Sequence, residues 1–582
     1  MSAQAATGND DVRYEPNERP AHILSVGLGF QAAMLTLAGI VLTPAIVIRV
    51  ADQGESYLNW AVFAALVISG LSTILQAVRV GRFGAGHILI MGTSGAFIAV
   101  SVAALVEGGP GLLAILVIIS AVFQFALAAR LSFLRRLITP VVAGTVIALI
   151  AATVMPILFD MLTTVPRGTP AAAAPASAAA TLLVSAALAL RASGIWRLWA
   201  PIIGIAVGYA VAVWLGLADF SAVVAAGWVG IPDPSAWPGL DLSFDRGFWV
   251  LLPAFAFVTL VGAIETIGDS VAIQRVSRRN PQATDYRTVQ GAVNADGVGN
   301  LLSGIAGTVP NTTYSSSVPF VELTGVGARS VGVVIGVVFL ALAFLPKVTA
   351  FLLTIPNPVV AAYAILFIGL LFVQGMKIAL QDGVDYRKAT IIGLAFWIGT
   401  GFQNQAIFAD QLGFELGTLL GNGMTAGSIV ALVLTMFVEL TSARRRRLKT
   451  DLDMASLPQI DEFLREFANK SGWDEAATQR LALVGEETLT NLLSQDDDED
   501  AAPRRLHIVA RRDRGVAELE FLAASDEDNI EDHLAHLTEQ RPEITDDERQ
   551  ISFRLLQHYA SSVRHQKYHD LDIVTVHVTN VS

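Results

Sequence analysis

Residues 248–269 read FWVLLPAFAFVTLVGAIETIGD. The first seventeen of them carry no charge, and a run of about 20 apolar residues is what a helix needs to cross a bilayer. Two acids, Glu265 and Asp269, come at its end. An acid at the bilayer centre costs roughly 2.5–3.5 kcal/mol on insertion scales, so it usually faces a cavity and has a function. This stretch therefore predicts a membrane helix that carries a site.

The composition extends this prediction to most of the 582 residues. Hydrophobic residues make up 53% of the chain and charged residues 15%, with a mean hydropathy of +0.55. An ordinary soluble domain has roughly 25% charged residues, so a cytoplasmic enzyme over most of the length is excluded. Cysteine is absent, which excludes disulfides, thiolate metal sites and cysteine nucleophiles. We expect no catalysis, cofactor, metal site or nucleic-acid partner, and no cleavable signal peptide, since residues 1–20 are polar.

Charge divides the chain into two parts. From residue 443 onward there are 29 acidic and 18 basic residues, whereas the first 442 hold 22 and 21. The basic cluster Arg444–Arg447 directly follows an apolar run, as at a cytoplasmic membrane boundary. We predict four regions: a cytoplasmic N-terminus (1–22), a membrane domain (23–442), a basic linker (443–460) and a soluble cytoplasmic domain (461–582).

The apolar runs predict an all-α membrane domain of fourteen spans. With the N-terminus inside, twenty basic residues fall in inner loops and four fall outside, as the positive-inside rule expects. Both termini are thus predicted to be cytoplasmic, in an integral protein of the cytoplasmic membrane. The predicted spans are 23–48, 57–78, 87–106, 111–129, 137–159, 173–190, 196–217, 247–274, 289–306, 312–325, 329–346, 350–376, 388–404 and 424–440.

The third and tenth spans are interrupted at corresponding places of two sets of seven. The interruptions are Gly92-Thr93-Ser94-Gly95 and Pro310-Asn311-Thr312-Thr313. Matched breaks in two halves are the best sequence indication of a transporter's midplane site. The alternative is that glycine and proline are simply tolerated here by helix packing.

The acids inside the spans suggest proton coupling. Glu265 and Asp269 are four residues apart, on one face of a helix, and close carboxylates in an apolar surrounding hold a proton more readily. Asp269 is equally well explained as a span-end residue near water. Asp296, in a glycine-rich run, suits a structural hydrogen bond as well as a function, and Glu322 is a further candidate in the short tenth segment.

These motifs resemble the nucleobase–ascorbate transporter family, the uracil and xanthine permeases. The matching residues follow the family order across the membrane domain: Glu18-Arg19-Pro20, Gln31, Gly70–Thr73, Gln76, Gly92–Ser94, Pro140, Gly144-Thr145, Glu265–Asp269, Asp296-Gly297, Asn300, Pro310–Tyr314 and Leu323–Arg329.

The resemblance implies two inverted seven-span repeats, with a short strand in spans 3 and 10 and the substrate between these strands and the eighth helix. Homodimers are common in the family. Glu265 would bind the ring N–H groups of a nucleobase, and a carboxylate is a suitable acceptor. The implied site comprises Glu265, Asp269, Gly95, Phe97, Ser315, Ser316 and Ser317, with Asp296, Asn311, Thr313, Tyr314, Glu322 and Gln31 as supporting residues.

The chain departs from the family pattern on the substrate side. Where the family has Gln or Glu followed by Asn, this chain has Ser316 and Ser317. Gly95 replaces an aromatic that often stacks on the base, with Phe97 two residues on, and Ala32 replaces a histidine. Because the tenth segment departs from the family pattern, the sequence does not predict the exact substrate.

The tail reads as a small α/β domain. We predict helices at 461–470, 475–493 and 551–563, and strands at 506–511, 517–523 and 573–578. Glu487–Asn491 resembles the Asn-box of anti-sigma-factor and histidine-kinase ATPases, whose Glu is a base and whose Asn holds Mg²⁺. Residues 525–529 (SDEDN) replace the expected glycine-rich loop and cannot approach phosphates closely. The tail is predicted to be a degenerate domain that binds a cytoplasmic protein or regulates transport.

The leading hypothesis is a secondary active transporter: proton-coupled symport of a substrate such as uracil, xanthine or urate, through Glu265 and Asp269. One alternative is an anion transporter of the sulfate-permease type, against which two carboxylates argue. The other is a membrane-anchored signalling protein with an active anti-sigma-kinase-like tail.

Overall fold

The computed structural model describes residues 12–131, 139–166, 168–280, 283–380, 383, 385–404, 406–407, 423–441, 446–493, 505–513, 516–523, 555–556, 558–568 and 572–579. Two compact units are present. The helical unit spans residues 10–279 and 288–438, and the second is formed mainly by residues 439–582.

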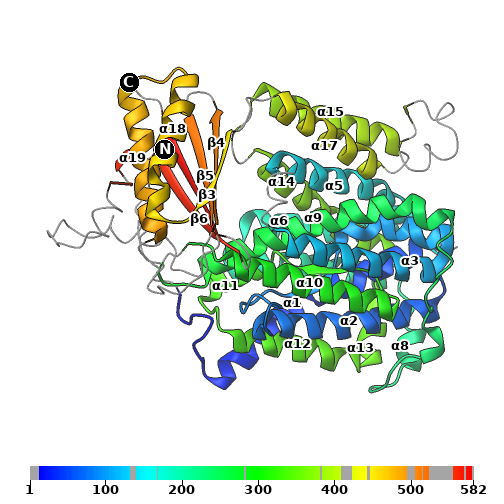
Figure 1. Cartoon of the computed structure of the whole chain (residues 1–582). Coiled ribbons are helices and arrows are strands. Elements are labelled where there is room, and N and C mark those ends of the chain that lie inside the picture. Colours follow the sequence, from blue (N-terminus) through cyan, green and yellow to red (C-terminus); the bar gives the residue numbers. More distant parts are fainter. Residues whose placement is uncertain are drawn as a thin grey trace. The chain divides into compact units, whose positions relative to one another are not determined.

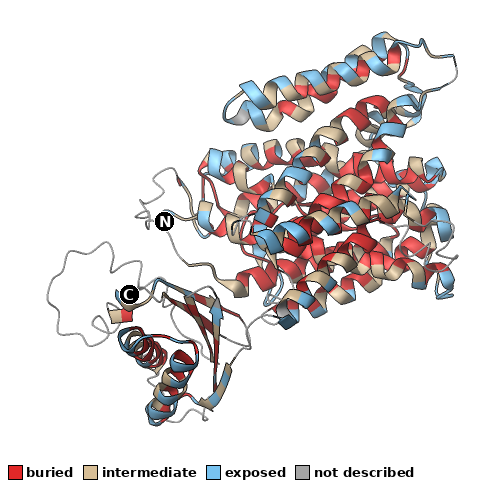
Figure 2. Cartoon of the chain, turned by 90° about the horizontal axis from the view of Figure 1, so that it is seen from above, coloured by how far each residue is buried: buried red, intermediate tan, exposed pale blue. Residues whose placement is uncertain are grey.

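The helical unit consists of apolar helices around a buried interior (Figures 1 and 2). Eight of its described helices are long and apolar enough to cross a membrane, and the pair α12–α13, bent by 84°, would make nine. Its helices are α1 (His22–Val50), α2 (Glu55–Val78), α3 (Ile98–Ala129), α5 (Pro140–Thr163), α6 (Ala173–Arg191), α7 (Ile195–Trp214), α8 (Ser221–Ala225), α9 (Arg246–Val276), α10 (Tyr286–Ala306), α11 (Ser317–Thr324), α12 (Arg329–Ala343), α13 (Pro346–Leu353), α14 (Asn357–Leu380), α15 (Tyr386–Gln403) and α17 (Gly423–Thr441), with 3-10 turns η1 (Gly95–Phe97) and η2 (Pro234–Ala236).

Glycines allow these helices to approach closely. A Cβ atom on Gly144 of α5 would stand 2.3 Å from the carbonyl oxygen of Gly375 on α14. Small residues at helix contacts are typical of membrane helices, since they let backbones pack directly.

One departure of the helix pattern from the sequence prediction lies at residues 350–376. Residues 350–376 were expected to form one segment, but α13 ends at Leu353 and α14 begins at Asn357. Pro356 lies between them, and the residue before a proline is disfavoured in a helix. The continuous span predicted there is wrong.

Two short strands interrupt the helices where the sequence analysis expected them. Strand β1 (Met91–Thr93) and strand β2 (Asn311–Thr313) pair antiparallel, with Gly92 opposite Thr312. The two breaks, more than 200 residues apart in sequence, therefore meet in one ribbon, which confirms the strands that the family resemblance implied in spans 3 and 10.

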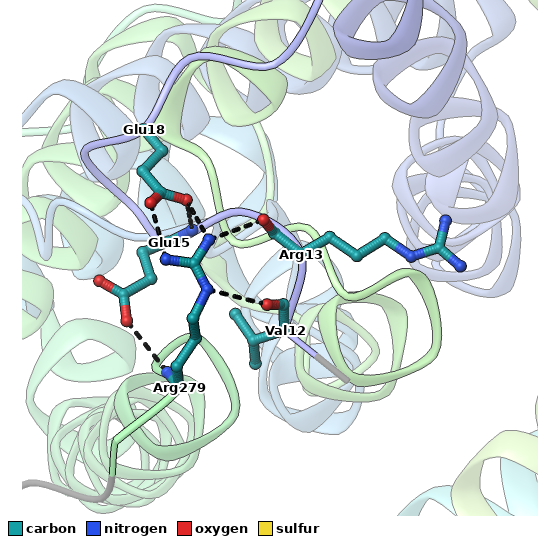
Figure 3. Close-up of polar contacts among 5 residues, drawn as sticks. All are labelled: Val12, Arg13, Glu15, Glu18 and Arg279. Atoms are coloured by element: carbon teal, nitrogen blue, oxygen red, sulfur yellow. Dashed lines mark hydrogen bonds and ion pairs between the residues drawn. The ribbon is translucent and has the colours of Figure 1, made fainter. Parts of the chain in front are cut away.

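Residues 12–20 form a segment that we call the N-terminal strap (Figure 3). The guanidinium group of Arg279, just after α9, donates to both carboxylate oxygens of Glu18 at 2.7 and 2.6 Å. The backbone N–H of Arg13 donates to Gly325 O at 2.7 Å, and Gly327 N–H donates to Tyr14 O at 2.8 Å. The strap therefore joins the end of α9 to the loop between α11 and α12.

The strap should loosen in a Glu18→Gln variant. The hydrogen bond from Arg279 lowers the pKa of Glu18, so the ion pair stabilises the strap at neutral pH and is lost as pH falls through the folded-state pKa. Hydrogen–deuterium exchange of the strap amides should be severalfold faster in the variant. Arg275→Gln is the matched control, because that arginine is exposed on the last turn of α9. Equal exchange in both variants would contradict the role given to the ion pair.

The second unit is an antiparallel five-stranded sheet in the order β3-β4-β5-β7-β6, with two helices packed against it (Figure 1). Its elements are β3 (Arg446–Asp451), η3 (Met454–Ser456), α18 (Leu457–Lys470), α19 (Glu475–Leu493), β4 (Arg505–Asp513), β5 (Val516–Ala523), β6 (Ser562–Lys567) and β7 (Asp572–Thr579).

Most of the elements predicted for the tail are present in this unit, with two differences. Strand β3 lies in the segment expected to be a linker, and Arg446 in it pairs with Glu466 of α18 at 3.1 Å. Residues 562–563, predicted to end a helix, begin β6. Alternate residues of β5 are buried, as expected for a strand with one face on a core.

Candidate substrate site

The β1–β2 ribbon is held by contacts that leave no room for a side chain at Gly92. The Tyr314 hydroxyl donates to Thr93 O at 3.1 Å, and the Thr93 hydroxyl donates to Gly39 O of α1 at 3.0 Å. A Cβ atom on Gly92 would stand 2.3 Å from the ring of Tyr314. Glycine is required here because the tyrosine ring lies directly on the strand.

A Gly92→Ala variant should therefore be destabilised, by about 1–3 kcal/mol as for other overpacked sites. We expect a lower Tm for the purified protein. The double variant Gly92→Ala/Tyr314→Ala, which removes the clashing ring, should recover part of the loss. Gly268→Ala is the control, since nothing lies within 4 Å of a Cβ atom there. A Tm equal to that of the control would show that the ring moves aside freely.

A cavity of about 390 Å³ opens beside the ribbon. It is mainly apolar, and among the described residues that line it, Glu265 alone carries a formal charge. Thr93, Ser315 and Ser316 provide further polar groups. Predominantly apolar walls with a few polar groups are typical of a site for a small organic ligand. The lining comes from α1, β1 and η1, α7 (Leu198, Pro201, Ile202), α9 (Glu265), β2 and α11, and α14 (Tyr363–Gln374).

Helix α9 brings Glu265 to this cavity. Asp245 caps the helix by accepting from Phe248 N–H at 3.1 Å, and the apolar residues that follow pack in the core. One turn beyond Glu265, Asp269 is outside the cavity lining and is 5% exposed. Its carboxylate accepts a hydrogen bond of 3.0 Å from Thr313 of β2.

A buried polar network continues from Asp269. The carboxylate of Asp296 on α10 accepts from Thr266 of α9 at 2.9 Å and from Gln124 of α3 at 2.6 Å. The side-chain amide of Asn300, one turn further along α10, donates to the side-chain oxygen Oε1 of Gln124 at 2.7 Å. The network therefore connects α3, α9 and α10 behind the wall that carries Glu265.

Asn300 and Asn311 extend the network to the strand. Asn300 accepts from the Asn311 N–H at 2.7 Å, and the Asn311 amide donates to Ser69 of α2 at 3.0 Å. Each of these contacts fixes β2 against a helix.

Nine of the predicted site residues thus fall into two groups. Glu265, Gly95, Thr313, Tyr314, Ser315 and Ser316 line the cavity. Asp269, Asp296 and Asn311 lie in the buried network behind it.

Four further candidates lie away from the cavity. Phe97 is buried, with its ring 6.1 Å from that of Phe255. Ser317 donates to Tyr314 O at 2.6 Å and accepts from Ile90 N–H at 2.9 Å, a structural pairing of α11 with the ribbon. Glu322 is exposed on α11, and Gln31 on α1 is half-buried outside the lining.

Helix α14 also contributes to the cavity, although no sequence motif marks it. Tyr363, Phe367 and Gln374 of this helix line the cavity. They lie in a continuous apolar run with no charge or motif to single them out, and only the three-dimensional packing reveals them.

The tail candidates occupy one helix of the second unit. Asn491 is 1% exposed on α19, and its amide donates to Glu487 O of the same helix at 2.8 Å. The loop at 525–529 lies outside the described residues.

Taken together, the apolar helices, the paired short strands and the cavity with its carboxylate define an integral membrane transporter. The chain belongs to the permease family that includes the xanthine and uracil permeases: the family model matches residues 24–409.

Relatives match over the same region. CPE0397 of Clostridium perfringens (strain 13 / Type A), provisionally named a purine permease, is 31% identical over 414 residues, which cover 70% of this chain and 88% of the relative. The xanthine permease XanP of Escherichia coli (strain K12) is 28% identical over 456 residues, covering 74% and 96%.

Among solved structures, the murine anion transporter Slc26a9 is 12% identical, with a TM-score of 0.49, covering 75% of this chain and 72% of that one. Likeness at this level carries no functional information.

Proposed function

We propose that this protein is a secondary active transporter that carries a nucleobase-like substrate, such as xanthine, uracil or urate, together with protons across the cytoplasmic membrane. The observation that carries the proposal is the position of Glu265, the one carboxylate among the described residues that line an apolar cavity beside the β1–β2 ribbon. A carboxylate accepts hydrogen bonds from ring N–H groups, and the apolar walls suit a planar ring. No chemistry is performed on the substrate.

The membrane domain is proposed to have fourteen spans in two inverted repeats of seven, with both termini cytoplasmic. The pairing of one short strand from each half supports the repeat. Proton coupling is proposed for Glu265, with Asp269 one turn away as the second carboxylate. A homodimer is expected, and the degenerate tail is proposed to bind a cytoplasmic protein partner.

Uptake measurements test the transport proposal. Cells that lack their own nucleobase carriers and express this chain should accumulate labelled xanthine, uracil or urate, and an uncoupler should abolish the accumulation. Replacing sodium with choline should leave it unchanged. Uptake of sulfate or bicarbonate without uptake of any nucleobase would indicate an anion transporter and overturn the proposal. The family match and the carboxylate in the cavity argue against that outcome.

A further inference from the structure

An aromatic ring on α14 lies in the cavity without an assigned role. Phe367 lines the cavity, and this residue is 46% exposed. A core phenylalanine would be buried, as Phe255 of α9 is at 0% exposure. Tyr363, one turn before it, lines the cavity on the same helix face.

The ring covers Gly95, the glycine that begins η1. A Cβ atom on Gly95 would stand 3.2 Å from Cε1 of Phe367 and 3.9 Å from its Cδ1. Any side chain at position 95 would therefore meet this ring. The ring of Phe367 can occupy this place because residue 95 is a glycine.

The ring reaches the cavity from a different group of helices than the carboxylate does. Helix α14 packs directly on α5 through Gly144 and Gly375, whereas Glu265 stands on α9, which is tied to β2 and α10 by the buried network. A planar ligand bound by Glu265 would thus meet a flat apolar surface supplied by other helices.

We propose that Phe367 is the residue that stacks on the ring of the substrate and thereby selects planar heterocycles. The inference rests on the proposed nucleobase transport. An aromatic ring with an accessible face in an apolar site stacks on any base, because every base has a π-face. Hydrogen bonds that the ligand donates to Glu265 would then recognise the edge of the ring, and stacking on Phe367 would recognise its face.

Binding of labelled xanthine, uracil and urate to the purified full-length protein tests this role. Phe367→Ala should weaken binding of the preferred base about tenfold or more, from the usual strength of base–aromatic stacking, and should raise the KM for uptake in proportion. Phe367→Trp should stay within about threefold of the wild type, because it keeps an aromatic face. Phe372→Ala is the matched control, since Phe372 is on the same helix, outside the cavity lining, and packs on Phe396.

The double variant Gly95→Phe/Phe367→Ala completes the test. It returns an aromatic ring from the opposite side, into the space that Phe367 vacates, and should recover part of the affinity, whereas Gly95→Phe alone should bind weakly because the two rings collide. Unchanged affinity in Phe367→Ala, or a lower kcat at constant KM, would overturn the stacking role. If the wild-type protein binds no nucleobase at all, both the proposed function and this inference fail. If the wild-type protein binds a nucleobase and Phe367→Ala binds it equally well, only this inference fails.

Discussion

The Glu265→Gln variant should reach the membrane in normal amounts and lose nearly all uptake. Glutamine has the size of glutamate, so the fold is retained, but its amide cannot be ionised and places an N–H₂ donor where an acceptor is needed. A hydrogen bond to a charged group contributes about 1.5–3 kcal/mol, which corresponds to roughly a tenfold to hundredfold loss of affinity. Loss of the proton-binding group adds to this, and we expect uptake to fall by more than about 100-fold.

Labelled substrate uptake, normalised to the amount of protein in the membrane, measures this effect. Glu322→Gln makes the same substitution at an exposed acid outside the cavity lining and should transport normally. Retained uptake in Glu265→Gln would remove the carboxylate from the site and, with it, the basis of the proposed coupling.

The sequence predicted the features that the bilayer constrains most strongly, which are the spans and their interruptions. Uncharged runs long enough to span a bilayer located most of the helices, and the matched glycine and proline breaks located β1 and β2, which pair in the structure. An acid after seventeen uncharged residues usually faces a cavity, and Glu265 lines one.

The sequence did not predict which side chains of a helix face the cavity and which face the core. Asp269 shares the helical face of Glu265 by spacing, yet its carboxylate bonds to Thr313 while Glu265 faces the cavity. Phe97 is two residues from Gly95, but it packs against Phe255 in the core. Phe367 had no signal because a ring in an apolar helix looks the same whether it faces lipid, core or ligand.

The buried network indicates that loss of the Asp296 side chain should strongly destabilise the protein. In an Asp296→Ala variant, the Gln124 amide and the Thr266 hydroxyl would lose their acceptor in a dry surrounding. Each buried donor left unsatisfied costs about 1–3 kcal/mol, and removing the carboxylate also opens space between α3, α9 and α10. We expect a much lower Tm and little folded protein in the membrane.

An Asp296→Asn variant distinguishes a structural role of Asp296 from a role in proton coupling. Asparagine keeps one carbonyl acceptor for Thr266 or Gln124, so the Tm should lie between those of the wild type and Asp296→Ala, and uptake should decline in step with the amount of folded protein. Asn294→Ala, on the same helix with its amide bonded to Arg82 O at an exposed position, should leave both unchanged. A Tm equal to that of the wild type, together with complete loss of proton-driven uptake, would place the coupling proton on Asp296, because only the ionisable group would then have been removed.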